Sequence, residues 1–309
     1  MRSLPVRSRF AVPWLLAAVA CGGTTDEDRL IPEYPKTGCP PSHEKVDGVC
    51  TVKEVFFPGG TFTLGAGYCD HAGALDVPPD LTDCPLADQP RTVTVKPFWV
   101  DATVLSAVLH PNPADEHCPS LDLSCARERY APVGGQFGFL GGLDPVEGIE
   151  NSCIKRGKRW LTEVEWEYIV TAGGTRKFPW GDRPPRCSDG NLDYEHCGNP
   201  NALRNGALPE LSLVGTFSSS PEGVFDLVGG LGEMLAANPE AYAEDYTAVP
   251  LRLPDCPNGW GTCDGWIGNI PTTVRRGGNS DTPLDELNPM RRGVINGGDS
   301  AFRCARSAE

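Results

Sequence analysis

Thirteen cysteines are the residues of this 309-residue chain with the widest range of chemistry. A cysteine thiolate can act as a nucleophile, form a disulfide or bind a soft metal ion. Cys21 stands apart from the other twelve, because it follows three arginines and the apolar run AVPWLLAAVA at residues 11–20. This order of charged, apolar and small residues is typical of an export signal, and the apolar run is too short for a stable membrane span.

Residues 1–21 therefore predict a bacterial lipoprotein signal. Its Leu-Ala-Ala-Val-Ala-Cys ending resembles a lipobox, in which Cys21 is diacylated and becomes the mature N-terminus. Gly22 follows, at the position where an aspartate would resemble an inner-membrane retention signal. We expect a protein anchored by lipid in the bacterial cell envelope, at the periplasmic face or the surface of the outer membrane. The alternative is an ordinary cleaved signal with a chance cysteine.

The other twelve cysteines are an even number in an oxidising compartment, so all of them can be bridged. The segment CPPSHEKVDGVC at residues 39–50 predicts a short hairpin closed by a Cys39–Cys50 disulfide. None of the cysteine-rich regions has the paired C-x-x-C spacing of a zinc site. The other locally spaced pairs are Cys69 and Cys84, Cys118 and Cys125, Cys187 and Cys197, and Cys256 and Cys263.

Three carboxylates, Glu163, Glu165 and Glu167, form a cluster that could suggest acid–base catalysis. Alternate residues do not share a helix face, so capping and solvation explain the three better. Thr162 and Glu165 have the spacing of a capping box, which predicts a helix that starts at Thr162 and stops near residues 173–174.

Alternating and β-branched sequence predicts strands before this helix. Residues 52–57 and 61–64 are expected to form two strands around the turn Pro-Gly-Gly, and residues 91–100 a half-buried strand. We divide the chain into a signal (1–21), a flexible tether (22–38), the disulfide-closed hairpin (39–50) and one main domain (51–309).

Composition limits the partners of the protein. The hydrophobic content of 39% supports a globular chain, and 36 glycines and 30 prolines indicate many loops. A formal net charge of −14 argues against nucleic acid and against anionic lipid surfaces as partners. Attachment to a membrane is therefore expected through the lipid alone.

The segment RWLTEVEWEYIVTAGGTRKFPWGD at residues 159–182 and five further segments, in the same order, resemble the formylglycine-generating enzyme (sulfatase-modifying factor) family. The five are FPGGTFTLG (57–65), VTVKPFWVDATV (93–104), GVFDLVGGLGE (223–233), VRRGGN (274–279) and AFRCAR (301–306). The resemblance implies a compact, irregular α+β fold, related to C-type lectins, with little regular secondary structure. Catalytic members oxidise a sulfatase cysteine to formylglycine with O₂ and a copper ion held by two cysteines.

The copper cysteines of the family follow its G-G-S motif, but residues 277–301 of this chain contain no cysteine. Counted without gaps, Thr282 and Leu287 stand in their places, and neither side chain offers a soft ligand for Cu(I). We therefore expect no copper and a pseudoenzyme that binds or scaffolds an unknown envelope protein or glycan.

Two alternatives remain open. One is an enzyme of altered chemistry in the same cleft, for which the sulfatase cysteine oxidase is the weakest version. The other is a structural envelope protein without a ligand. The polar residues that could serve altered chemistry are Asp281, Asp285, Glu286, Arg291 and Arg292, for which a solvated loop is the simpler interpretation.

The resemblance also implies a long-range disulfide between Cys153 and Cys304, after which the remaining ten cysteines fall into five local pairs. It further implies a structural calcium ion, because hard cations bind carboxylate and carbonyl oxygens. The first calcium site maps to Asp226, the carbonyls of Gly229 and Leu231, and Glu233; the second maps to Asn191 and the carbonyl of Leu192. Without calcium, Glu233 would cap a turn and Asp226 would be solvated.

Overall fold

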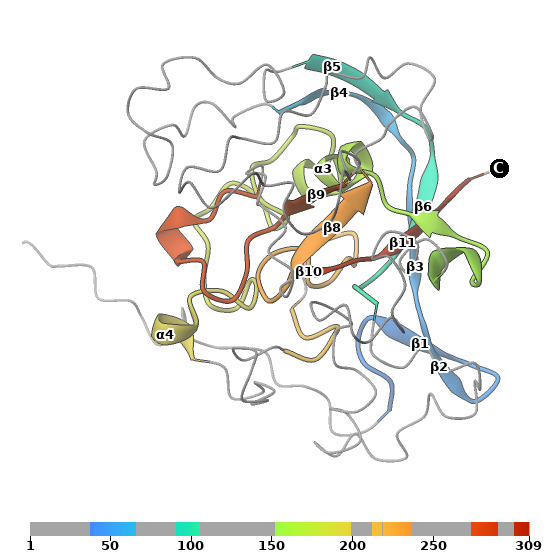
Figure 1. The fold of residues 1–309 in the computed structure, drawn as a ribbon, viewed down its shortest axis with the longest axis horizontal. Helices are drawn as coiled ribbons and strands as arrows, with labels where there is room; N and C mark the ends of the chain where they lie inside the picture. The colour runs from blue at the N-terminus through green and yellow to red at the C-terminus, as the bar shows by residue number, and fades with distance from the viewer. Residues whose placement is uncertain are drawn as a thin grey trace, which may run out of the picture.

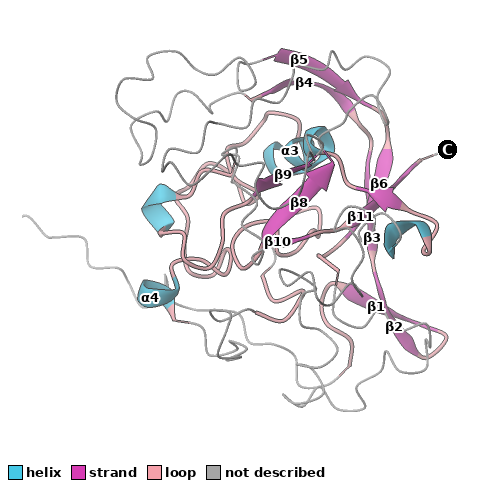
Figure 2. Cartoon of the chain, viewed as in Figure 1, coloured by secondary structure: helices cyan, strands magenta, loops and turns pink. Residues whose placement is uncertain are grey.

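The computed structural model describes residues 38–65, 91–105, 152–198, 212–217, 219–236, 273–289 and 300–308. Figures 1 and 2 show short strands and few helical turns in these ranges, joined by long loops. This mixture of helix and strand with little regular structure confirms the α+β class expected from the sequence. Among the described residues, no helix is long and apolar enough to cross a bilayer.

The described strands form four small sheets. Strands β3, β6, β11 and β7 form an antiparallel four-stranded sheet, β10, β8 and β9 a three-stranded sheet, and β1–β2 and β4–β5 two ribbons. The strands are β1 (His43–Val46), β2 (Val49–Val52), β3 (Glu54–Phe57), β4 (Gly60–Leu64), β5 (Arg91–Val95), β6 (Phe98–Asp101), β7 (Arg159–Trp160), β8 (Gly232–Ala236), β9 (Thr273–Arg276), β10 (Ser300–Ala301) and β11 (Cys304–Ser307).

The single strand predicted at residues 91–100 is wrong, because the chain breaks at residues 96–97. The first part, β5, pairs with β4, and the second part, β6, pairs with β3. Pro97 has no N–H for a sheet ladder, which favours a break at this point. Gly59 packs against the break so closely that a Cβ would lie 2.2 Å from the carbonyl oxygen of Val95. Residues 91–101 therefore contribute one strand to each of two different sheets.

Helix α3 (Glu163–Thr171) has the predicted capping box. The amide of Glu165 donates to Thr162 Oγ1 (3.2 Å), and the amide of Thr162 donates to Glu165 Oε2 (3.1 Å). The helix ends where Ala172 turns left-handed, with φ of 47°. Trp166 and Ile169 are fully buried in the core beneath it. The start and the end of the helix are thus confirmed.

The three carboxylates of α3 are buried, so the expected solvation is wrong. Glu163 accepts from Arg276 Nε (2.8 Å), and Glu167 lies 3.1 Å from another nitrogen of the same guanidinium. Glu165 accepts two hydrogen bonds from Arg159. Strands β9 and β7 bring these arginines to the helix, and their charges offset the cost of burying the carboxylates.

The main core lies between α3 and the strands β3 to β6. The ring of Tyr168 stands edge-on to Phe57, Phe62 and Phe98, with centroids 5.5 to 6.5 Å apart. Its hydroxyl donates to the carbonyl of Gly59 at 2.6 Å, so the polar end of this half-buried side chain is satisfied. The helix is thereby fixed to the turn between β3 and β4.

The C-terminal residues Phe302, Arg303 and Cys304 are all buried. Arg303 donates to both carboxylate oxygens of Glu233, one of them at 2.7 Å. Glu233 belongs to β8 of the three-stranded sheet. Its other hydrogen bonds reach the carbonyls of Asp101 (3.3 Å), Phe225 (3.0 Å) and Asp226 (3.4 Å). One guanidinium therefore ties together three segments that are far apart in the sequence.

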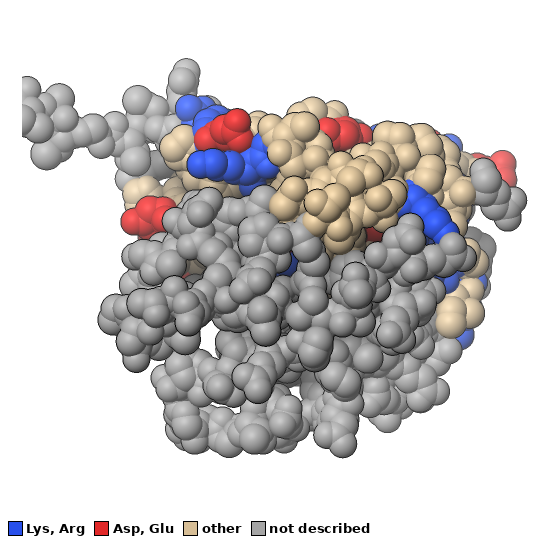
Figure 3. All heavy atoms as spheres, turned by 90° about the horizontal axis from the view of Figure 1, so that it is seen from above, with Lys and Arg blue, Asp and Glu red and all other residues tan. Residues whose placement is uncertain are grey.

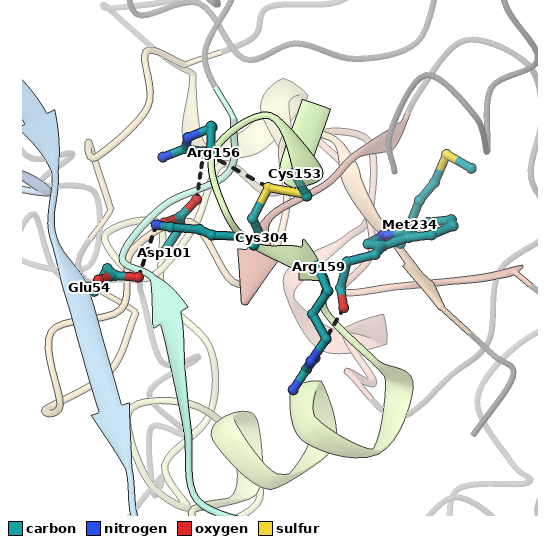
Figure 4. Close-up of a disulfide and its surroundings, with 9 residues drawn as sticks. Glu54, Asp101, Cys153, Arg156, Arg159, Met234 and Cys304 are labelled. Carbon is teal, nitrogen blue, oxygen red and sulfur yellow. Dashed lines mark hydrogen bonds and ion pairs between the residues drawn. A yellow bond between two sulfur atoms is a disulfide. The ribbon is translucent and has the colours of Figure 1, made fainter. Parts of the chain in front are cut away.

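Three disulfides occur among the described residues, and all are pairs expected above. Cys153 is joined to Cys304, a separation of 151 residues, beside Arg156 and Asp101 (Figure 4). The other two bonds, Cys39–Cys50 and Cys187–Cys197, close local loops. Six predicted bridge cysteines lie outside the described residues, namely Cys69, Cys84, Cys118, Cys125, Cys256 and Cys263.

The β1–β2 ribbon is the hairpin that the Cys39–Cys50 bond closes. Its Ser42 is fully buried and lies so close to Gly215 that a Cβ there would be 2.2 Å from the Ser42 hydroxyl. His43 is buried next to it, with Nδ1 3.0 Å from the same hydroxyl. Burial, together with the positive charges of Arg156 and Lys53, lowers the pKa of His43 from 6.5 to about 4.

We predict that the long-range disulfide stabilises the fold more than a local one does. Replacing Cys153 and Cys304 by alanine should lower the free energy of unfolding by about 5 kcal/mol in the chain-entropy model, against about 3 kcal/mol for Cys187 and Cys197. The reason is that the first bond closes a much longer loop of the unfolded chain. Denaturant titration of the two double variants measures the difference, and equal losses would contradict the prediction.

We also predict that the protein loses stability as pH falls from about 6.5 to about 4. In this window the unfolded chain protonates His43, whereas the folded protein holds the ring neutral. The loss should be on the order of 3 kcal/mol and should level off below pH 4. Unfolding midpoints measured across this window test it. The variant His43→Gln should flatten the curve, and the exposed His196→Gln should not.

Candidate functional site

The two positions that would carry the copper cysteines lie beside the same glycine. A Cβ built on Gly278 would stand 3.0 Å from Thr282 Oγ1 and 3.4 Å from Leu287 Cδ1. Gly278 has a φ of 71°, which favours glycine, and the chain turns back on itself here. The fold therefore brings the two replaced positions together, although neither side chain is a thiol.

Both replaced side chains have a structural role. Thr282 Oγ1 donates to Asn279 Oδ1 and accepts from the amide of Asn279, both at 2.9 Å, so its hydroxyl closes a turn. Leu287 is buried and packs in one cluster with Leu192 and Val228. A hydrogen-bonded hydroxyl and a buried isobutyl group cannot bind Cu(I) as a thiolate pair does.

A loop closed by the Cys187–Cys197 bond supports this segment. It contains the short helix α4 (Tyr194–Cys197). The amide of Asp193 donates to the carbonyl of Thr282, and the amide of Tyr194 to the carbonyl of Ser280, both at 3.0 Å. The 3-10 turn η7 (Leu284–Glu286) follows in the replaced segment. The two loops are therefore held against each other by their backbones.

Aromatic side chains stand against the cluster around Leu287. The rings of Phe178 and Trp180 are stacked with centroids 5.2 Å apart, and both are half-buried. The guanidinium of Arg183 lies 5.5 Å from the Trp180 centroid and donates to both oxygens of Asp189. This arrangement offers apolar contact area and an Arg183–Asp189 ion pair close to the replaced positions.

The charged residues of the replaced segment that the structure describes differ in their exposure. Asp281 and Asp285 are exposed, and Glu286 is half-buried. Arg291 and Arg292 lie outside the described residues.

The predicted calcium ligands divide into two groups. Asn191, Asp226, Gly229 and Leu231 line one cavity of about 30 Å³, which could hold a single small ion or water. Glu233 and Leu192 do not line it, and both oxygens of Glu233 accept from Arg303. No group of three or more His, Cys, Asp or Glu side chains suited to a metal ion occurs within the described ranges.

Asp226 is neither a free ligand nor a solvated side chain. Its Oδ2 accepts from Thr103 Oγ1 (2.6 Å) and the amide of Gly215 (2.5 Å), and its Oδ1 accepts from the amide of Phe217 (3.1 Å). Burial raises the pKa of the Asp226 carboxyl, and these hydrogen bonds act in the opposite direction. Calcium binding at this cavity stays a prediction.

Sequence reasoning missed the arginines that organise the site. Arg303 and Arg276 are among the most buried side chains, yet each lies far in sequence from its carboxylate partner. The signal that could have found Arg303 is its position between Phe302 and Cys304, because a single charge in a short apolar segment requires a buried partner.

Comparison with known proteins gives the family. A model of the sulfatase-modifying factor enzyme 1-like domain matches residues 145–308. No curated protein matches the chain. Among solved structures, PvdO from Pseudomonas aeruginosa is 19% identical with a TM-score of 0.48, covering 88% of this chain and 100% of its own. CarF is 15% identical with a TM-score of 0.43, covering 84% and 99%. Because the family model spans more than half of the sequence, this chain belongs to the sulfatase-modifying factor (formylglycine-generating enzyme) family.

Proposed function

We propose that the protein is a lipid-anchored envelope protein whose family domain binds or scaffolds a partner and does not carry out copper-dependent cysteine oxidation. The observation that carries the proposal is the pair Thr282 and Leu287. Both stand at the family's copper positions, and both are used in turn formation and packing. Reverting to oxidase chemistry would require new side chains and the loss of these contacts.

Binding is supported by the aromatic side chains next to the replaced segment. Phe178 and Trp180 are half-buried, and the Arg183 guanidinium, paired with Asp189, lies over the Trp180 ring. Aromatic residues and arginine are enriched where proteins contact partners. An envelope protein or a glycan is the partner that we expect for this surface.

Location in the cell envelope is supported by the signal pattern that ends at Cys21 and by the three disulfides of the described residues. Disulfides persist in oxidising compartments. The lipid on Cys21 would then hold the protein at the outer membrane.

We predict that the mature protein binds no Cu(I) tightly, whereas the double variant Thr282→Cys, Leu287→Cys gains a site. Two thiols placed beside Gly278 would supply the soft ligand pair that the natural chain lacks. Titration with Cu(I) against a competing chelator measures both proteins. A stoichiometric, tight site in the natural protein would overturn the proposal.

A thiol count under denaturing conditions serves as the control for this titration. The natural mature protein should show no free thiol, because we propose that all twelve of its other cysteines are bridged and that Cys21 carries lipid. The double variant should show two. Two free thiols in the natural protein would point back to oxidase chemistry.

We further propose that calcium binds at the first site that the family resemblance implies, with Asp226, the carbonyls of Gly229 and Leu231, and Glu233 as its ligands. The ion would have to displace hydrogen bonds that both carboxylates accept. At a hundredfold excess over its dissociation constant, calcium should stabilise the protein by about 2.7 kcal/mol. Thermal unfolding with calcium or with a chelator measures this. The calcium-dependent shift should vanish in Asp226→Asn and persist in Asp285→Asn, a matched change at an exposed site. An unchanged midpoint in the natural protein would contradict calcium binding.

A further inference from the structure

An aromatic and cationic row crosses the outer face of the four-stranded sheet. Phe56 on β3, Trp99 on β6 and Arg306 on β11 are direct cross-strand neighbours. The rings of Phe56 and Trp99 are 5.1 Å apart, and the Arg306 guanidinium lies 4.9 Å from the Trp99 centroid. Phe56 is 46% exposed, which is unusual for so large an apolar side chain beside a second ring.

A basic turn adjoins this row. Ile154, 61% exposed, and the exposed Lys155 lie in it. Arg156 donates to Asp101 at 2.8 Å, and Lys158 lies 3.0 Å from Glu54, so the turn is fixed to β6 and β3. Figure 4 shows Arg156 directed at Asp101, with Glu54 on the neighbouring strand. We call the row and the turn together the basic face.

Glu54 connects the two parts of the basic face. Arg306 donates two hydrogen bonds of 2.9 Å to its carboxylate, and Lys158 contacts the same group. Arg156, Lys158 and Arg306 share ion pairs with Glu54 and Asp101, and the exposed Lys155 adds a fourth cation. Four cations therefore stand against two carboxylates in the basic face.

This local charge has the opposite sign to the chain, whose formal net charge is −14. Figure 3 shows basic and acidic side chains on both sides of the face that it views. At physiological salt, charges more than about 8 Å away are largely screened. A charged surface that touches the basic face therefore interacts mainly with the charges of that face and not with the net charge of the whole protein.

The proposed anchor reaches the body of the protein on this side. Sixteen residues, 22–37, separate Cys21 from Gly38, a reach of about 55 Å when extended. The chain then passes through the β1–β2 hairpin and, after Lys53 alone, enters β3, the edge strand of the basic face. A lipid on Cys21 would hold this strand near the bilayer at a high effective concentration.

We propose that the basic face rests on an anionic phospholipid surface, with Phe56 and Ile154 at the headgroup level. This proposal rests on the lipid anchor of the proposed function for its biological setting. The cations supply attraction to phosphate, and the two exposed apolar side chains supply contact with the interface.

The test uses the mature chain from residue 21 with Cys21→Ser, so that no lipid contributes. We expect it to sediment with phosphatidylcholine vesicles that contain phosphatidylglycerol and not with phosphatidylcholine alone. Lys155→Glu should lower the partition coefficient on the order of tenfold, since each basic residue near such a surface adds several-fold. Lys177→Glu, the same exposed charge reversal after α3, should leave binding unchanged. Ile154→Ser should also weaken binding.

Equal effects of Lys155→Glu and Lys177→Glu, equal binding to both vesicle types, or no binding would overturn the proposal. Equal thermal midpoints of the two charge-reversal variants establish that folding is intact. The anchor is tested separately, by the mass of the N-terminal peptide of the natural protein isolated from membranes. An unlipidated Cys21 would remove the anchor and leave the vesicle result standing, so the two failures can be told apart.

Discussion

The buried ion pair between Arg303 and Glu233 is the contact on which the other parts of the domain depend. The Arg303 guanidinium is fully buried, and it also donates hydrogen bonds to three backbone carbonyls, those of Asp101, Phe225 and Asp226. Removing one partner of such a pair leaves an uncompensated buried charge, at a cost of about 3–5 kcal/mol. The Arg303 side chain therefore holds three segments in one arrangement: the loop at residues 225–226, strand β8 of the three-stranded sheet, and the end of β6.

The residues at the two positions compared with the family's copper cysteines contact their neighbours in the fold. Thr282 closes a turn and Leu287 joins an apolar cluster, while the backbone still brings both to Gly278. The scaffold thus brings the two positions together and places a hydrogen-bonded hydroxyl and a buried alkyl group there. This separation of scaffold from chemistry is common, because function depends on a few side chains grafted on a fold.

Features that depend on neighbours in sequence could be predicted, and those that depend on distant partners could not. Thr162 and Glu165 are three residues apart, so the start of α3 follows from local geometry. Glu163 is 113 residues from Arg276, and nothing in the local pattern shows that it is buried. The family resemblance predicted the Cys153–Cys304 pairing. It did not predict that Glu233, expected as a calcium ligand, forms an ion pair with Arg303. The break at Pro97 needed the tertiary contact with Gly59.

The place of β11 in its sheet has a consequence for the order in which the domain folds. This strand lies between β6 and β7, and its pairing with β6 joins Ala305 to Val100. Pairs so distant in sequence carry a large loop-closure entropy, so they form slowly. We therefore expect the local β1–β2 hairpin to form early, and the centre of the four-stranded sheet to close late in folding.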